Sequence, residues 1–161
     1  MGNLYIPLET LLLDLGAEVV VPPPCTRRTL DLGVRLSPEF ACLPLKVTLG
    51  NFLEAEESGA EAVIMAGGCG PCRFGYYAQV EREVLKAAGC GLEMVVLEPP
   101  QGNLPALLAE VRRWVPGFTW TRFWRAFQLT WAKVVAIDEV EREVQRVRAV
   151  EAVPGEADRL F

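Results

Sequence analysis

The fold class rests on one stretch of the sequence, AVIMAGGCGPCRFGYYAQVEREVLKAAG (residues 62–89). Five apolar residues at 62–66 predict a short buried strand, and the apolar side chains from Phe74 to Ala88 recur at the spacing of a helix. A loop of glycines and cysteines separates the two segments, and Gly89 ends the helix. A strand, a glycine-rich loop and an amphipathic helix in this order are typical of a parallel α/β sheet.

The same alternation continues on both sides of this stretch. Mostly apolar runs at residues 17–21 and 92–97 predict two further strands, each followed by prolines. Helices are expected at residues 3–15, 27–32 and 43–57. We therefore expect an α/β fold with a mostly parallel, Rossmann-like sheet, flanking helices and a long C-terminal helix.

The second half of the sequence has a different pattern. Helices are expected at residues 104–114 and 119–150, with an apolar stripe along the second, and all four tryptophans lie in this half. The stripe favours packing on the sheet, or a helix that crosses to another lobe or subunit. We therefore predict two parts. Residues 1–102 form an α/β cysteine-bearing lobe, and residues 103–161 form a helical extension that packs on it or leads to a missing second lobe.

Composition and charge exclude several classes of protein. The chain of 161 residues has a formal net charge of −5 and scattered basic residues, which argues against nucleic acid as the main partner. It has no window of about 18 uncharged apolar residues and no basic start, so neither a membrane span nor a signal peptide is expected. The expected location is the cytoplasm, where the five cysteines stay reduced. Histidine is absent, which removes the commonest general base and the commonest zinc ligand.

Four of the five cysteines lie in loops that open helices. A helix start carries partial positive charge and N–H groups without partners, which stabilise the thiolate that binds a metal or attacks a substrate. Because loops after the carboxyl ends of parallel strands meet at one edge of a sheet, we expect these sulfurs to converge. Cys90, between two glycines, is expected to be a bystander, since a lone cysteine often serves as a small buried apolar residue. The four candidates are Cys25, Cys42, Cys69 and Cys72.

The motif Cys69-Gly70-Pro71-Cys72, between a strand and a helix, has the spacing of the thioredoxin-like oxidoreductases. One cysteine then acts as the thiolate at the helix start, and the other resolves the mixed disulfide. The glycines before the motif and the α/β segments that precede it are not typical of that fold. A thiol–disulfide oxidoreductase therefore stays open as an alternative, and a cysteine-bound zinc scaffold is a third.

A longer segment resembles the 2-hydroxyacyl-CoA dehydratase superfamily, and it reads PPPCTRRTLDLGVRLSPEFACLPLKVTLGNFLEAEESGAEAVIMAGGCGPCRFGYYAQVEREVL (residues 22–85). Within that superfamily it is most similar to the acyl-CoA dehydratase activase-related proteins, also described as CoA-substrate-specific activases. The resemblance covers about residues 3–100 and is most specific at residues 37–46 (SPEFACLPLK) and 67–76 (GGCGPCRFGY). The family also has a strand before the first helix and a second lobe after the long helix, so the sequence is expected to be the N-terminal lobe only.

The resemblance implies an iron–sulfur protein. In this superfamily three cysteines per lobe bind the cluster, which is either a four-iron (4Fe-4S) cubane with an open site or a double cubane shared across a dimer. Carried over to this sequence, the metal ligands are Cys25, Cys42 and Cys72, and Cys69 adjoins them. A site made only of thiolates needs no histidine.

The activity that the resemblance implies is electron transfer. An ATP-dependent activator protein delivers a low-potential electron to the cluster, which drives the dehydration or reduction of a CoA thioester or another small substrate. The sequence has no Walker A motif, so the chain is placed on the recipient side, as one component of such an enzyme system and in one arrangement as a homodimer.

Three charged residues near the cysteines are further candidates, while the catalytic residues stay unassigned. Lys46 and Arg73 are expected to balance the charge of a cluster or to hold a phosphate-bearing ligand. Glu39 is a candidate acid or base. The alternative for each of them is a solvated or helix-capping charge.

Overall fold

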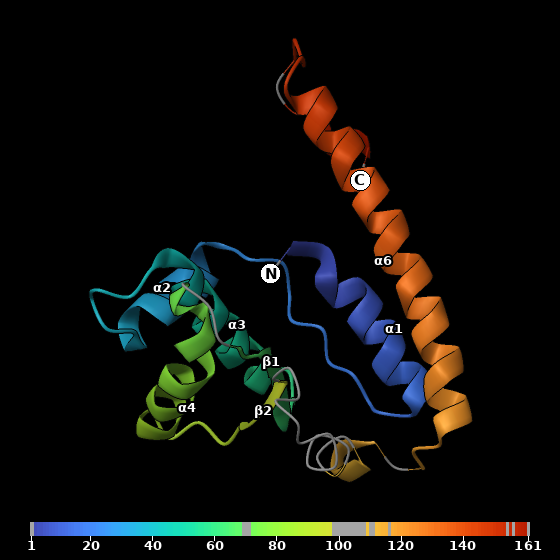
Figure 1. Ribbon diagram of the computed structural model, residues 1–161. Coiled ribbons are helices and arrows are strands. Elements are labelled where there is room, and N and C mark those ends of the chain that lie inside the picture. Colours follow the sequence, from blue (N-terminus) through green and yellow to red (C-terminus); the bar gives the residue numbers. More distant parts are fainter. Residues whose placement is uncertain are drawn as a thin grey trace. The chain divides into compact units, whose positions relative to one another are not determined.

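The computed structural model describes residues 2–68, 72–97, 109, 112–115, 117–153, 155 and 157–160 (Figure 1). By its internal contacts the chain divides into two units, one formed by Met1–Glu18 with Trp114–Phe161 and the other by Val19–Arg113. The described elements, in chain order, are η1 (Gly2–Leu4), α1 (Tyr5–Leu15), α2 (Arg27–Leu36), α3 (Leu43–Glu57), β1 (Ala62–Ala66), η2 (Arg73–Tyr76), α4 (Tyr77–Ala87), β2 (Glu93–Leu97), α6 (Trp120–Arg148) and η3 (Ala157–Leu160).

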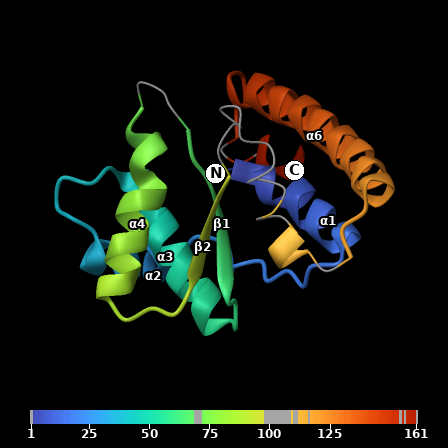
Figure 2. The same ribbon diagram turned by 60° about the horizontal axis from the view of Figure 1, so that its bottom comes forward.

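The sheet is much smaller than the sequence predicted. In the described part of the chain it consists of two parallel strands, β1 and β2, paired from Ala62 with Glu93 to Ala66 with Leu97. The described residues are mostly helical, and β1 and β2 are five residues long each. The prediction of a mostly parallel, Rossmann-like sheet with flanking helices is therefore wrong. What remains of it is one unit of strand, loop, helix and strand, in which α4 joins the two parallel strands (Figure 2).

The expected strand at residues 17–21 accounts for part of the difference. This segment has no strand pairing and runs from the end of α1 toward α2. The Ala17 N–H closes α1 by donating to Leu12 O at 2.9 Å. Three prolines follow at residues 22–24, and they have no N–H to offer a neighbouring strand. Val20 and Val21 are 37% and 39% exposed, so the apolar run is a connection between the two units.

The predicted helices are present, with small shifts at their ends. α2 is longer than predicted, and its start is capped because the Thr26 and Thr29 hydroxyls each accept the other residue's backbone N–H. α3 has the predicted bounds, with Cys42 at its N-cap and Pro44 in its first turn. The predicted helix at residues 104–114 falls mostly outside the described residues.

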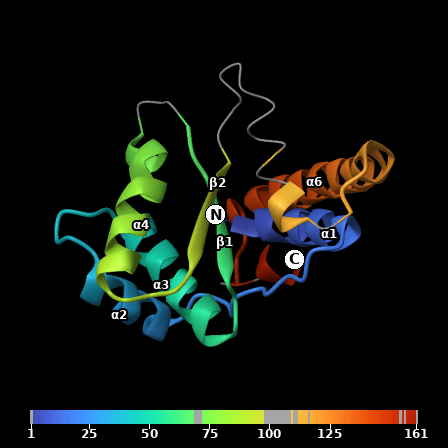
Figure 3. The same cartoon turned by 90° about the horizontal axis from the view of Figure 1, so that it is seen from below.

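The core of the Val19–Arg113 unit lies between the sheet and two helices. Figures 2 and 3 show α3 and α4 on the same side of the paired strands. Each large apolar side chain removed from water contributes roughly 1.5–3 kcal/mol to stability, so this cluster holds the two helices against the sheet. Its buried members are Leu45, Leu49, Phe52, Val63, Met65, Tyr77, Ala78, Leu85 and Met94.

Two glycines bring α2 against α3. A Cβ atom on Gly33 would lie 1.6 Å from Lys46 O, and one on Gly50 would lie 1.9 Å from Thr29 O. The backbones of the two helices therefore touch at both points, which only glycine allows. Beside the contact, the buried Thr29 hydroxyl donates to the carboxylate of Glu54 at 2.8 Å. The contact holds the first turns of α3 in place.

In the other unit, α1 packs along α6 (Figure 1). The buried residues of α6 are the small Ala126 and Thr130, which allow a neighbouring helix to approach. The Lys133 ammonium donates to the Thr10 hydroxyl across this contact, at 2.6 Å. By these contacts α1 groups with the C-terminal residues, whereas the sequence-based division at residue 102 placed it with the cysteines.

The aromatic residues at the start of α6 lie on a face that α1 leaves exposed. Trp120, Trp124 and Trp131 are 55%, 60% and 59% exposed. Phe127 stacks between two of them, with ring centroids 5.9 Å from Trp124 and 6.3 Å from Trp131. The rings thus contact one another along one side of the helix. Among the described helices, α6 included, none is long and apolar enough to cross a membrane.

We predict that Gly33→Ala lowers the free energy of unfolding by about 2–3 kcal/mol, because its Cβ overlaps the Lys46 carbonyl and the helices must separate. Alanine at an unobstructed helix position would instead stabilise by about 1 kcal/mol. Urea unfolding measures the difference. The matched control is Gly91→Ala, whose Cβ has its nearest atom, Glu56 Oε1, at 3.7 Å. A Gly33→Ala protein as stable as the wild type would contradict the close contact.

Candidate functional site

The candidate site begins at the first residue of α3. Cys42 is the N-cap of this 15-residue helix, and its side chain is exposed. The unpartnered N–H groups and the positive end of the helix dipole favour the thiolate form at this position. Cys42 Sγ lies 2.5 Å from the hydroxyl oxygen of Tyr77. The site therefore has an exposed sulfur above a tyrosine.

Tyr77 is the first residue of α4 and is held in the core. Its side chain is 5% exposed, and its ring packs on Phe74 with centroids 5.3 Å apart. The pKa of Tyr77 is raised to about 12, first by the hydrogen bond with Cys42, then by burial and by the negative charges of Cys42, Cys72 and Glu81. The phenol therefore stays protonated at ordinary pH and is able to donate a hydrogen bond to the Cys42 sulfur.

Cys72 lies at the start of the helical run formed by η2 and α4. It is exposed, and its charge is one of the causes that raise the pKa of Tyr77. Cys42 contacts Tyr77, and Cys72 is near enough for its charge to raise the pKa of that tyrosine, although the two cysteines are 30 positions apart in the sequence. Neither of these two cysteines forms a disulfide.

Glycines shape the loop between β1 and η2. Gly68 has a φ of +148°, in the region that side chains other than glycine rarely adopt. A Cβ on Gly75 would lie 2.1 Å from Gly68 O, so the loop after β1 packs directly on η2. This contact holds the Cys72 end of the loop beside α4. Cys69 lies outside the described residues.

Cys25 lies elsewhere in the same unit. Its Sγ is 3.5 Å from the side chain of Asn51, which belongs to the middle of α3. Asn51 follows Cys42 by nine residues, about 13 Å along the helix axis. Within the described residues no three cysteine, histidine, aspartate or glutamate side chains form a group that can hold a metal ion. Cys25, Cys42 and Cys72 therefore do not close a three-cysteine site in this arrangement.

The predicted charged residues lie close to the cysteines in the sequence. Lys46 extends back along the first turn of α3, and its ammonium donates to Glu39 O at 3.3 Å. This bond ties the loop before Cys42 to the helix. Glu39 is exposed. Arg73 belongs to η2, and its side chain lies outside what the structure describes.

Glu81 was missed by the sequence reasoning. It lies one turn after Tyr77 on α4, is 0% exposed, and neither carboxylate oxygen has a hydrogen-bond partner among the described residues. Burial raises the pKa of Glu81 to about 8, and the negative charge of Cys42 adds to this. The carboxyl group is therefore mostly neutral at pH 7. Glu81 is four residues from both Tyr77 and Leu85, which lie on the buried face of α4. This spacing in the sequence could have predicted that Glu81 is buried too.

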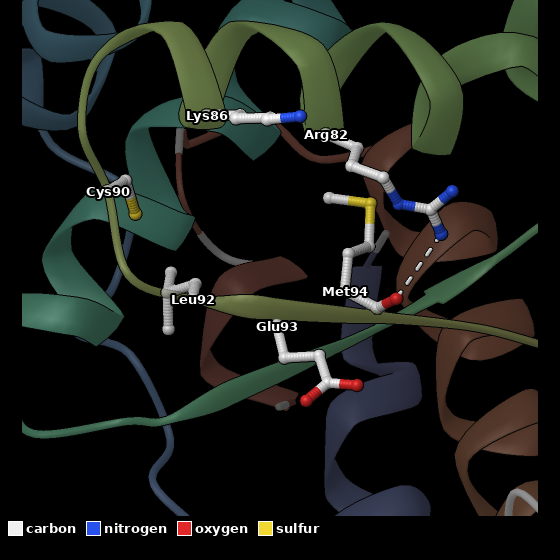
Figure 4. Close-up of a pocket in the computed structure, with 6 residues that line it drawn as sticks. All are labelled: Arg82, Lys86, Cys90, Leu92, Glu93 and Met94. Atoms are coloured by element: carbon white, nitrogen blue, oxygen red, sulfur yellow. Dashed lines mark hydrogen bonds between the residues drawn. The ribbon is translucent and has the colours of Figure 1, made fainter.

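A pocket of about 380 Å³ lies on the other side of α4 (Figure 4). Arg82 donates to Met94 O at 3.3 Å at its edge, and Lys86 follows one turn later. Burial, above all, raises the pKa of the Cys90 thiol, which also hydrogen-bonds to Glu56. A thiol kept protonated is a poor nucleophile and a poor metal ligand, so this pocket is separate from the chemistry of the exposed cysteines.

Comparison with known proteins gives no relative. No family model matches the chain, and neither the curated proteins nor the solved structures contain a significant match.

Glu81 makes stability depend on pH. Its pKa is about 8 in the folded chain against an ordinary value of 4.5, so its stabilising contribution is complete below 4.5 and is lost as the pH rises through 8. We predict that the free energy of unfolding falls by about 1.4 kcal/mol per pH unit within this window, and that Glu81→Gln removes that slope. Urea unfolding between pH 5 and 9 measures it. Glu83→Gln, on the exposed side of the same helix, is the control and keeps the wild-type slope.

Proposed function

We propose that this chain is an iron–sulfur protein in which Cys42 and Cys72 bind a cluster that accepts low-potential electrons from an ATP-dependent activator, for a reductive or dehydration reaction. One observation carries the proposal. Two exposed thiols that precede two different helical segments both act on one buried tyrosine, Cys42 by direct contact and Cys72 through its charge. The family resemblance of the segment at residues 22–85 supplies the type of cofactor and reaction.

The donor set fits such a cluster. The chain has no histidine, and thiolates are the usual ligands of iron–sulfur clusters. Cys42 and Cys72 would hold the group, and Cys69, three residues before Cys72 in the sequence, is the proposed third ligand. Cys25 belongs to a segment without regular structure and has one long hydrogen bond, to Asn51. The iron and sulfide content of Cys25→Ser tests whether it is a ligand.

When bound, such a cluster supplies one-electron transfer at low potential. The residues around it then have separate tasks. The hydroxyl of Tyr77 shares a hydrogen bond with the Cys42 sulfur. Glu81, mostly neutral at pH 7 beneath them, adds little negative charge to a site that already carries thiolates. Lys46 fixes the loop that leads into Cys42.

The surface around the two thiols suits a protein electron donor. Phe40, two residues before Cys42, is 81% exposed, and Tyr76, four residues after Cys72, is 75% exposed. Exposed aromatic residues are enriched where proteins dock. We place the ATP-dependent activator here, and a CoA thioester or another small substrate as the final electron acceptor. A homodimer and a cytoplasmic location, where thiols stay reduced, complete the proposal.

The experiment is anaerobic reconstitution with iron and sulfide, followed by quantification of both and a visible absorption spectrum. We expect the wild type to bind iron and sulfide, and Cys42→Ser and Cys72→Ser to lose most of both. Cys90→Ser is the matched control, since this thiol is partly buried and protonated, and it keeps the wild-type content. Cys25→Ser and Cys69→Ser identify the remaining ligands.

Three results would contradict the proposal. A wild-type protein that stays colourless and binds no sulfide rules out the cluster. Stoichiometric zinc without iron indicates the zinc scaffold instead. Reduction of insulin disulfides that is lost in Cys72→Ser but survives in Cys25→Ser and Cys42→Ser indicates the thioredoxin-like oxidoreductase.

A further inference from the structure

The pocket between α4 and β2 contains two positive charges. Arg82 and Lys86 are four residues apart on α4, so their side chains leave the same face of the helix. In Figure 4 the Lys86 side chain extends toward Arg82. Both residues are exposed, and neither forms an ion pair within the part of the chain that the structure describes. The two cations are therefore available to an anion.

One hydrogen bond places the guanidinium of Arg82 at the edge of the pocket. Its Nη2 donates to Met94 O, on β2, at 3.3 Å (Figure 4). A guanidinium has five N–H groups, so most of its donors remain for a ligand. Its planar fork matches two oxygens of an anionic group, and the ammonium of Lys86 adds three donors and a second charge.

The acidic residue beside the two cations faces away from them. Glu93 lines the pocket, but in Figure 4 its side chain lies on the opposite side of β2 from the side chain of Met94, as the alternation along a strand requires. Its carboxylate oxygens accept from Nη1 and Nη2 of Arg113, at 2.7 and 3.0 Å. Glu83, between the two cations in the sequence, is not among the described residues that line the pocket. The pocket therefore keeps its positive charge, although the chain has a net charge of −5.

The rest of the pocket is apolar. Leu92 and Met94 line it from β2 and its start, and Cys90 lines it from the segment that leads into the strand. Its volume of about 380 Å³ falls within the range of about 300–1,000 Å³ that is usual for small-molecule sites. Two cations beside an apolar wall fit a small molecule that has one strongly anionic group and one apolar part.

We propose that this pocket binds a small organic phosphate, with the phosphate group between Arg82 and Lys86 and the apolar part against Leu92 and Met94. A phosphate monoester carries about −1.5 to −2 charge at pH 7 and has three terminal oxygens, which suits a guanidinium and an ammonium together. A carboxylate has one charge and two oxygens, so it uses the pair less fully. The site goes beyond the proposed function, because its residues lie apart from Cys42 and Cys72 and need no metal.

The test measures the binding of phenyl phosphate to the metal-free full chain by isothermal titration calorimetry at low salt. We expect saturable binding at one site. Arg82→Gln and Lys86→Gln should each weaken it about fivefold, since an exposed ion pair contributes up to about 1 kcal/mol. The matched control is Arg35→Gln, which removes an exposed arginine of α2 and keeps the wild-type affinity. Inorganic phosphate, which lacks the apolar part, should bind about tenfold more weakly.

The thiol of Cys90 gives a second readout, because it lines the pocket. With phenyl phosphate at about four times its dissociation constant, about one fifth of the pockets are empty, so N-ethylmaleimide should modify Cys90 about fivefold more slowly. Peptide mass spectrometry measures this rate, with the exposed Cys25 as the reference whose rate stays unchanged.

Four results would overturn the proposal. They are no saturable binding of phenyl phosphate, wild-type affinity in both Arg82→Gln and Lys86→Gln, the same loss of affinity in Arg35→Gln, and a Cys90 rate that the ligand leaves unchanged. None of them concerns iron or sulfide. The phosphate site and the iron–sulfur cluster can therefore fail separately.

Discussion

The site depends on one apolar contact, the packing of α3 and α4 against β1. Leu49 of α3, Met65 of β1 and Leu85 of α4 are almost completely buried. A contact of this kind is worth several kcal/mol, because each large side chain contributes roughly 1.5–3 kcal/mol on leaving water. It also fixes the axes of two helices relative to each other. Cys42 directly precedes α3, and Cys72 directly precedes η2, which continues into α4, so this packing also places the two segments that carry the cysteines.

The same core contains a buried carboxyl group, which lowers the stability of the core. Glu81 stands in the apolar face of α4 without a hydrogen-bond partner among the described residues, and burial keeps its carboxyl group mostly neutral at pH 7. A leucine or methionine of similar volume would fill the position with no cost of desolvation. A buried polar group of this kind is expected where a protein gives up stability for a local electrostatic requirement. The charge of Cys42 helps to raise the pKa of Glu81, and the charge of Glu81 helps to raise the pKa of Tyr77, which ties the requirement to the thiol site.

Local patterns in the sequence were enough to predict the helices but not the sheet. The bounds of α3 follow from its first-turn proline and its apolar spacing, and both act within the helix itself. The run at residues 17–21 has the composition of a buried strand, yet a strand also needs a neighbour to pair with, which composition does not supply. The site divides in the same way. The cysteines at helix starts were readable from the sequence, whereas Tyr77 and Glu81 acquire their roles from a tertiary contact with Cys42.

Because the expected sheet is absent from the described residues, the positions of the cysteines need another structural explanation. The chemistry open to the thiols stays the same. The sequence-based argument brought the cysteines together at the edge of a parallel sheet, where the loops after several strands meet. The structure has two strands in its described part, so the convergence of Cys42 and Cys72 has another cause. Cys42 precedes α3 and contacts the hydroxyl of Tyr77, whereas Cys72 precedes η2 and acts on the same tyrosine through its charge. Cys25 contacts α3 at Asn51, in the middle of the helix, and not at the first turn of α3, where Cys42 lies. A thiolate site on this chain therefore derives its geometry from helix starts and one tyrosine, and its ligands are to be sought among the cysteines that share them.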